Sequence, residues 1–236
     1  MIIHGDCLKV MAGMPASSFD LVIADPPYNI GVDYGDGSKA DRRIDYPAWC
    51  RSWISQCWEV LRPTGSLWVI SGQEHGADID LAIRGAGFTI RNRITWHETF
   101  GVYCHGKFGR TSRPIFYAVK GPRFTFNADK VRVPSARQSK YRDKRANEAG
   151  KIMGDVWEIP RVCGTFKQRV KGVPTQLPET LVERIILVSS NPGSKVLDPF
   201  AGSGTTVAVA NRLMRWPTGI EKSEVFCGIA RDRCSV

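Results

Sequence analysis

Two short segments carry residue types that could do chemistry, and the first is Asp25-Pro26-Pro27-Tyr28. It follows an apolar run over residues 21–24 that predicts a buried strand. Two successive prolines fix their own backbone angles and cannot continue a sheet ladder, so Asp25 and Tyr28 are held rigidly at the carboxyl end of that strand. The Asp25 carboxylate and the Pro26 carbonyl offer two acceptors at one spot, and Tyr28 offers a flat face for a planar ring. This combination fits the exocyclic amine of a nucleobase, whose nitrogen becomes a usable nucleophile when both of its hydrogens are accepted.

The second segment spans residues 198–206 and reads DPFAGSGTT. An acidic residue, Asp198, again ends a predicted strand, and two glycines permit a tight turn and close backbone approach before a helix that begins near Thr205. Glu221 lies 17 residues beyond the second glycine, where a carboxylate can accept both hydroxyls of a ribose. Position 207 is Val rather than the third glycine of a dinucleotide fingerprint. The loop therefore favours a single-nucleoside cofactor over a nicotinamide or a flavin.

The elements that position these segments alternate between strand-like and helix-like patterns along most of the chain. Such alternation predicts an α/β fold with a mainly parallel sheet and helices on both faces. Helices are expected over Ala48–Leu61 and Glu179–Ser190, and the tryptophans of the first are interpreted as core residues rather than a ligand platform. The expected strands are Phe19–Ala24, Ser66–Ser71, Phe88–Trp96, Ile115–Val119, Lys195–Asp198 and Thr218–Glu221.

The positive charge is concentrated in one part of the chain. The 236 residues carry a net charge of +10, which favours a polyanionic partner such as nucleic acid. Residues 120–172 hold 14 Lys or Arg against 5 Asp or Glu, a net +9, and lack a clear hydrophobic period. This segment is either a solvated basic loop or an inserted surface that tracks phosphates and reaches base edges. The cations expected to contact DNA are Arg137, Lys140, Arg142, Lys144 and Arg145.

Other features exclude whole classes of protein. Hydrophobic residues make up 42% of the chain, so it can bury a core. The first ten residues lack the apolar core of a signal peptide, and no later stretch approaches a membrane span, so a cytoplasmic protein without a membrane partner is expected. The seven cysteines include no CxxC pair, which argues against a disulfide framework or a zinc site, and the expected chemistry needs no metal.

The two chemical loops together resemble the DNA amino-methyltransferases that use S-adenosylmethionine, in the motif order where DPPY precedes FxGxG. The similarity covers residues 4–31 and 175–231, and residues 113–117 resemble a strand beside the target-base pocket of that family. It implies a Rossmann-like methyltransferase sheet, mostly parallel with one antiparallel strand. Residues 1–119 and 173–236 would form the catalytic domain, and residues 120–172 the inserted target-recognition region.

The resemblance also implies roles for individual residues. The residues expected to hold and activate the target amine are Asp25, Pro26, Pro27 and Tyr28. The residues expected to bind the cofactor are Asp6, Cys7, Asp25, Thr175, Asp198, Phe200, Ala201, Gly202, Ser203, Gly204, Thr205 and Glu221. Relatives usually have Lys-Pro after Thr-Gln, whereas this chain has Leu177-Pro178, which removes one expected cationic contact.

The function expected from these residues is methyl transfer to N6 of adenine in double-stranded DNA, with the base rotated out of the helix. Asp at the first motif position favours adenine, and N4 of cytosine is the alternative because it offers the same amine. Methylation of RNA or of a protein glutamine is a weaker alternative, since an Asn-Pro-Pro-Tyr variant marks many of those enzymes. A DNA-binding protein that has lost turnover and a small-molecule methyltransferase are the remaining rivals. A restriction-modification setting and a homodimer are further expectations.

Overall fold

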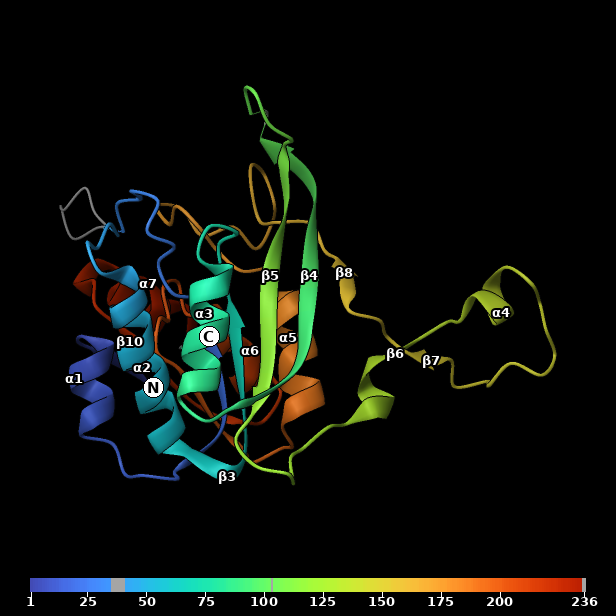
Figure 1. The fold of residues 1–236 in the computed structure, drawn as a ribbon, viewed down its shortest axis with the longest axis horizontal. Coiled ribbons are helices and arrows are strands. Elements are labelled where there is room, and N and C mark those ends of the chain that lie inside the picture. Colours follow the sequence, from blue (N-terminus) through green and yellow to red (C-terminus); the bar gives the residue numbers. More distant parts are fainter. Residues whose placement is uncertain (35–40, 103, 235–236) are drawn as a thin grey trace.

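The computed structural model describes residues 1–34, 41–102 and 104–234. Among these residues, eight strands form one sheet in the order β1-β10-β9-β2-β3-β5-β4-β8 (Figure 1). Every neighbouring pair is parallel except those that involve β5, which runs against both β3 and β4. The predicted sheet, mostly parallel with one antiparallel strand, is therefore confirmed. The strands are β1 (Ile2–His4), β2 (Phe19–Ala24), β3 (Leu61–Ile70), β4 (Thr89–Val102), β5 (Arg110–Val119), β8 (Val156–Glu158), β9 (Lys195–Asp198) and β10 (Trp216–Glu221).

Strand β2 shows why the central strands have continuous apolar sequences. Its side chains alternate between the faces of the sheet, and helices cover both faces, so Leu21, Val22, Ile23 and Ala24 are all fully buried. Val22 and Ala24 belong to one hydrophobic cluster, and Leu21 and Ile23 to another.

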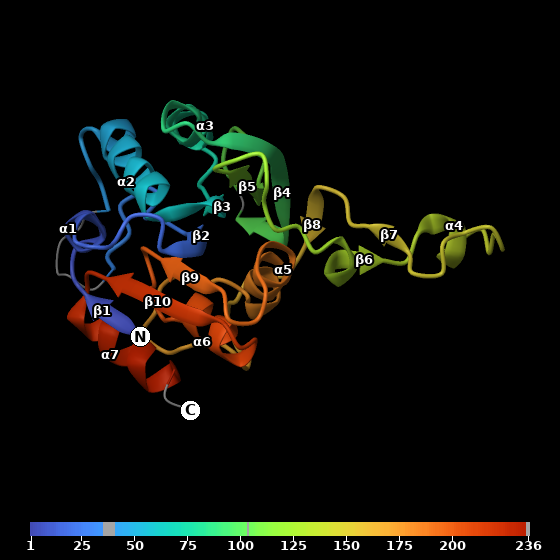
Figure 2. The same ribbon diagram turned by 90° about the horizontal axis from the view of Figure 1, so that it is seen from below.

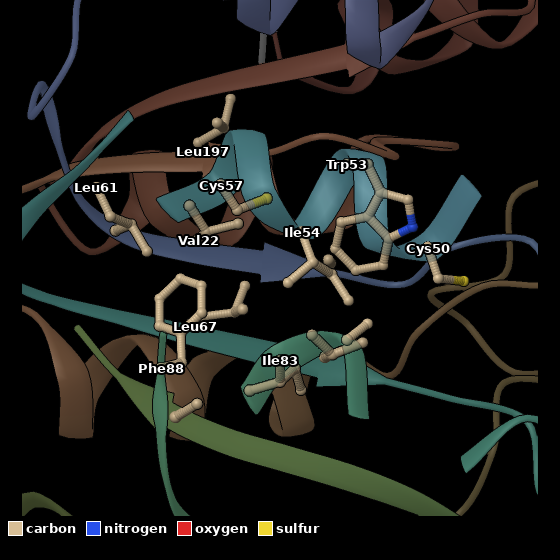
Figure 3. Packing of buried hydrophobic residues seen from close by; sticks show 14 of the residues in the cluster. Val22, Cys50, Trp53, Ile54, Cys57, Leu61, Leu67, Ile83, Phe88 and Leu197 are labelled. Carbon is tan, nitrogen blue, oxygen red and sulfur yellow. The ribbon is translucent and has the colours of Figure 1, made fainter. Parts of the chain in front are cut away.

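Three helices cover one face of the sheet and three lie on the other (Figure 2). The first group packs its apolar side chains onto β2 and β3, with Trp53, Ile54 and Cys57 fully buried (Figure 3). On the opposite face, the predicted helix after Pro178 buries Leu181, Ile185 and Ile186. The first group is α1 (Cys7–Ala12), α2 (Tyr46–Val60) and α3 (Gly76–Gly85), and the second is α5 (Glu179–Ser189), α6 (Thr205–Arg212) and α7 (Glu224–Cys234).

Several strands differ from the sequence-based expectation. Strand β1 is only three residues long and has too few side chains to show a period. Strands β4 and β5 are longer than predicted and form a hairpin that rises above the rest of the sheet (Figure 1). Strand β8 comes from the basic segment and pairs with β4 at the edge of the sheet, where Trp157 is buried.

The middle of the basic segment stands away from the body of the molecule as an arm, residues 132–152 (Figures 1 and 2). Two short strands, β6 (Arg132–Val133) and β7 (Lys151–Ile152), pair at its base, and the helix α4 (Ala136–Ser139) lies farther out. Before the arm, a 3-10 helix, η1 (Ala128–Val131), follows Asn127, whose amide donates to the carbonyls of Leu187 and Ser190 at 2.9 Å each. The two ends of the basic segment are thus attached to the body, and only its middle projects.

Candidate active site

A cavity lies at the carboxyl ends of β2, β9 and β10, and both chemical loops line it. Tyr28 and Phe200 line it together, although they are far apart in sequence. Of the predicted catalytic and cofactor residues, Gly204 alone does not line this cavity. Those that do are Asp6, Cys7, Asp25, Pro26, Pro27, Tyr28, Thr175, Asp198, Phe200, Ala201, Gly202, Ser203, Thr205 and Glu221.

The Asp25-Pro26-Pro27-Tyr28 loop is held in place from outside the cavity. The Tyr46 hydroxyl at the start of α2 donates to the Pro27 carbonyl at 2.7 Å. Tyr46 is itself packed against the His75 ring, with centroids 4.4 Å apart. Because α2 buries its apolar face in the core, the Tyr46 contact connects the loop directly to a rigid element.

Burial dominates the electrostatics of Asp25. Desolvation raises the pKa of its carboxyl to about 6, while Arg113 and the Tyr28 hydroxyl oppose that rise. The Tyr28 hydroxyl donates a short hydrogen bond to one Asp25 oxygen. At neutral pH the carboxylate is therefore mostly ionised and can accept further hydrogen bonds.

Behind Tyr28 lies a pair of charged residues that the sequence analysis missed. Arg113 on β5 donates from Nη1 to the Tyr28 hydroxyl at 3.0 Å. Its Nε lies 3.0 Å from Oε1 of Glu98 on β4, and Glu98 is only 5% exposed. The resemblance of residues 113–117 to a strand beside the target-base pocket was the available signal for Arg113, whereas Glu98 lies beyond the strand predicted over Phe88–Trp96.

The glycine loop and Glu221 form one unit. The backbone N–H of Gly202 donates to Oε2 of Glu221 at 2.8 Å, and the N–H of Ser223 donates to Oε1 at 2.8 Å. Gly204 adopts φ +76° at the start of α6, and a Cβ there would lie 3.0 Å from the Cβ of Ala230. Gly204 therefore permits the turn of the loop and the close packing of α7. Glu221 lines the cavity, and the two backbone N–H groups orient its carboxylate.

Asp198 places a second buried carboxyl in the cavity wall. It is 5% exposed and accepts from the N–H of Phe200 at 2.9 Å. Desolvation raises its pKa to about 7, against a hydrogen bond from the Thr206 side chain. A buried carboxyl with these few donors is suited to bind an ammonium group or another donor in the cavity.

Trp49, in the outer wall of the cavity, does not have the core role that was expected for the tryptophans of α2. Trp53 is fully buried and meets the Phe200 ring edge-on at 5.2 Å, as expected of a core residue. Trp49 is partly exposed, lines the cavity and lies 5.6 Å from Phe200. The Arg43 guanidinium covers the other side of Trp49 at 4.4 Å. Helix periodicity placed both tryptophans on one face, but only the tertiary packing shows that this face extends past the core into the cavity.

The segment before α5 forms another part of the wall. Thr175 lines the cavity, and its side chain hydrogen-bonds Tyr34, whose pKa burial raises to about 12. Gln176 accepts from the N–H of Val170 at 2.9 Å and donates to the carbonyl of Gln168 at 2.7 Å. Leu177, at the position where relatives have a lysine, is 8% exposed and supplies apolar surface instead.

Asp6 and Cys7 lie at the start of α1. The Asp6 side chain accepts from the N–H of Leu8 at 3.0 Å and so caps this helix. Burial raises the pKa of the Cys7 thiol to about 12, so it stays protonated and can offer only a small apolar surface.

The predicted DNA-binding cations are not part of this cavity. All are exposed on the arm: Arg137, Lys140, Arg142, Lys144 and Arg145. Arg145 and Arg137 both approach the Asp143 carboxylate, at 3.0 and 4.0 Å. Within the described ranges, no group of three or more His, Cys, Asp and Glu residues could hold a metal ion, and no helix has the length and apolar character of a membrane span.

Solved structures with a similar architecture include proteins described as DNA methyltransferases. The PvuII DNA methyltransferase, described as cytosine-N4-specific, matches with a TM-score of 0.77 at 18% identity over 98% of this chain and 85% of its own. M1.HpyAVI in complex with SAM matches with a TM-score of 0.71 at 23% identity over 100% and 99%. TTHA0409 from Thermus thermophilus, described as a putative DNA modification methylase and complexed with S-adenosyl-L-methionine, matches with a TM-score of 0.69 at 25% identity over 99% and 94%. The fold class is therefore that of the Rossmann-like methyltransferases.

The sequence comparisons narrow this class to one family. The N6_N4_Mtase family, described as DNA methylase, matches residues 19–232. The chain is 39% identical to the DNA adenine methyltransferase YhdJ of Escherichia coli (strain K12), over all of this chain and 82% of that protein. It is 35% identical to the type II methyltransferase M.HpaI of Haemophilus parainfluenzae, over 98% and 73%. This chain belongs to the DNA methylase family, which confirms the resemblance seen in its two chemical loops and the expected class of enzyme.

Proposed function

We propose that this protein transfers a methyl group from S-adenosylmethionine to N6 of an adenine that is rotated out of double-stranded DNA. The observation that carries the proposal is the shared cavity, in which Asp25 and Tyr28 face the same space as Phe200 and Glu221. An amine acceptor and a nucleoside-binding wall are thus adjacent, as direct transfer between two bound molecules requires.

The residues of the cavity fit S-adenosylmethionine. Glu221, already oriented by two backbone N–H groups, keeps lone pairs free for the ribose hydroxyls, and Asp198 is a buried acceptor for the ammonium group of the methionine part. Phe226 and Ile220, both buried, supply apolar wall for an adenine ring, with Asp6 and Cys7 nearby. When bound, the cofactor supplies a methyl group activated by its sulfonium.

The Asp25 loop holds the target amine. The free Asp25 oxygen and the Pro26 carbonyl accept its two hydrogens, while the Tyr28 ring stacks on the base. Rotating a base out of a duplex costs a few kcal/mol, which the stacking and these hydrogen bonds offset. Holding nitrogen, methyl carbon and sulfur in line can lower the barrier by roughly 7 to 11 kcal/mol. Water can take the proton that the amine releases after transfer, so Asp25 acts as an acceptor rather than as a base.

Adenine is favoured over cytosine by the Asp at position 25 and by the name of the relative with 39% identity, a DNA adenine methyltransferase. Cytosine N4 is the alternative, because the PvuII enzyme with the same fold is cytosine-N4-specific. Both amines present two hydrogens to the same acceptors, so the identity of the base is read by the rest of the cavity.

The basic segment 120–172 is the proposed target-recognition region, with its arm as the part that reaches the duplex. The arm has its own internal order. Ser135 and Gln138 form a capping box, and the Gln138 amide donates to the carbonyl of Asn147 at 2.7 Å. Lys140 lies 5.5 Å from the ring of the exposed Tyr141. The arm thus projects from the body, is stabilised by its own hydrogen bonds, and exposes cations and an aromatic ring. Such a surface suits phosphate contacts along a duplex.

The setting of the enzyme is part of the same proposal. A DNA substrate and relatives from bacteria support a setting in the cytoplasm of a bacterial or phage-infected cell. The family resemblance implies that two copies can form a homodimer, which sedimentation velocity measures with and without a duplex.

The test is to incubate the purified protein with S-adenosylmethionine and unmethylated plasmid, and then to analyse the digested nucleosides by mass spectrometry. N6-methyladenine is expected, and sequencing of the methylated plasmid gives the recognition site. N4-methylcytosine would establish the alternative base. DNA binding without any methylated nucleoside would establish a binding protein without turnover.

A further inference from the structure

Arg113 is close to the reaction but outside the cavity. It does not line the space in which Asp25 and Tyr28 lie, so it can affect methyl transfer only through other residues. Its Cα is paired with that of Trp96 across the antiparallel β4–β5 ladder, and Glu98 is two residues farther along β4. Residues two apart in a strand point to the same face, so Glu98 and Arg113 meet on the face that carries Trp96.

The guanidinium is fixed on several sides. Its Cζ lies 5.1 Å from the centroid of the Tyr28 ring and 5.4 Å from that of Trp96, which is 1% exposed. Its Nε lies 3.0 Å from Glu98, and its Nη1 donates to the Tyr28 hydroxyl at 3.0 Å. The Tyr28 hydroxyl uses its hydrogen in the hydrogen bond to Asp25, so it accepts the Arg113 N–H through an oxygen lone pair. The result is a chain of contacts: an ion pair joins Glu98 to Arg113, and hydrogen bonds join Arg113 to Tyr28 and Tyr28 to Asp25.

We propose that Arg113 is a positioning residue for methyl transfer: fixed by Glu98, it holds the Tyr28 ring and hydroxyl so that Asp25 stays an ionised acceptor for the target amine. This inference rests on the proposed function. The planar fork of arginine suits the role, because one edge can bind the carboxylate while another N–H reaches the hydroxyl.

Charge balance gives the physical reason. Burial and, to a smaller extent, the nearby Glu98 raise the pKa of Asp25, whereas Arg113 lowers it, and the net pKa is about 6. Opposite charges hold the pKa of Arg113 above its usual value even though burial acts to lower it. Without Arg113, the Asp25 carboxyl would face Glu98 with no cation between them and would take up a proton nearer neutrality. A protonated carboxyl loses its strong acceptor and cannot draw both hydrogens of the amine.

Several elements contribute titratable groups around Asp25. Some of these groups lie on the Asp25-Pro26-Pro27-Tyr28 loop, β4 and β5. The others lie at the end of β9, at the start of α2 and in the segment that follows the Asp25-Pro26-Pro27-Tyr28 loop. These groups are Tyr28, Glu98, Arg113, Asp198, Tyr46 and Tyr34. The charge of Arg113 lowers the pKa of Asp25, so its removal should raise that pKa.

The test is the pH profile of the single-turnover methylation rate, from pH 5.5 to 9, for Arg113→Met. We expect the acidic limb to move up by at least one pH unit and the rate at pH 6.5 to fall at least about threefold, with recovery at pH 9. Binding of S-adenosylhomocysteine, measured by calorimetry, should not change, because Arg113 lies outside the cavity. The matched control is Arg110→Met on the same strand, whose exposed guanidinium pairs with Glu74 and should leave the profile unchanged.

Measurements in two further backgrounds, Glu98→Gln and Tyr28→Phe, keep the test decisive. Arg113→Met leaves Glu98 buried without a cation, so the double variant Glu98→Gln with Arg113→Met is measured too, and it should still lose the acidic rate relative to Glu98→Gln alone. If Arg113 acts through the hydroxyl, its effect on the acidic limb should be at least halved in a Tyr28→Phe background. An equal loss of rate at every pH, or no halving, would overturn the inference while the proposed function stands. Failure of the wild-type protein to methylate any DNA would overturn both.

Discussion

The cavity and the arm are built in different ways. The walls of the cavity come from loops at the ends of buried strands, and their polar groups are held by partners far away in the sequence, such as Glu221 on Gly202 and Tyr46 on Pro27. Within residues 132–152 Gly150 alone is buried, and the hydrogen bonds of Gln138 and Arg145 reach only nearby residues. The cavity is suited to hold reacting atoms at fixed distances, and the arm is suited to adapt to a long charged partner. The predictions below test this difference.

The largest expected effect is on catalysis at the cavity. Asp25→Ala removes the acceptor for the target amine, so the single-turnover methylation rate should fall by about 100- to 1000-fold or more, the loss typical of one preorganised hydrogen-bonding group. S-adenosylhomocysteine affinity should change little, because this carboxylate acts on the base. Retention of turnover would remove Asp25 from the mechanism.

Core and arm substitutions should separate clearly in stability. Leu197→Ala removes a fully buried side chain from the sheet and should cost about 2–5 kcal/mol in free energy of unfolding. Tyr141→Ala on the arm, where the side chain is 67% exposed, should change it by less than about 0.5 kcal/mol. Chemical denaturation measures both values, and a large loss for Tyr141→Ala would show that the arm is packed more tightly than its exposure indicates.

The arm should dominate the salt dependence of DNA binding. Changing Lys140, Arg142, Lys144 and Arg145 to Gln should weaken duplex binding and reduce the slope of log K against log salt by about 0.9 per lost phosphate contact. Fluorescence anisotropy at several salt concentrations measures it, with the melting temperature and S-adenosylhomocysteine affinity as controls that should not move. An unchanged slope would show that these cations form a solvated surface that does not contact the DNA phosphates.

The smallest expected effect is the pH dependence of stability that comes from Asp198. Its carboxyl has a pKa of about 7 in the folded protein because of burial, against about 3.9 in an unfolded chain. Between these values the folded state binds more protons, so this group lowers the free energy of unfolding as pH rises and its full cost is present above pH 7. Asp198→Asn should therefore raise the free energy of unfolding and the Tm of the cofactor-free protein at pH 8 and have little effect at pH 4. Equal effects at both pH values would contradict this origin.

The sequence itself determined the sheet and the two loops, because these depend on local chemistry. A short apolar run bounded by turn residues, such as residues 21–24, indicates a buried strand, consecutive prolines stop a strand, and glycines permit the turn at residues 202–204. The carboxyl ends of parallel strands lie at one edge, so the meeting of Asp25 with Asp198 followed from chain order and fold class. The three-residue strand β1 was too short to give a pattern, and β8 lay within a segment without hydrophobic period.

Only the tertiary structure decided which residues support the loops. Arg113 and Glu98 are isolated charges in the sequence, and their relation to Tyr28 depends on the antiparallel register of β4 with β5. Trp49 and Trp53 share a face of α2, but only the tertiary packing around Phe200 places Trp49 in the cavity wall and Trp53 in the core. Contacts of this kind arise between strands and helices that are distant in the chain, so residue spacing along one segment contains no information about them.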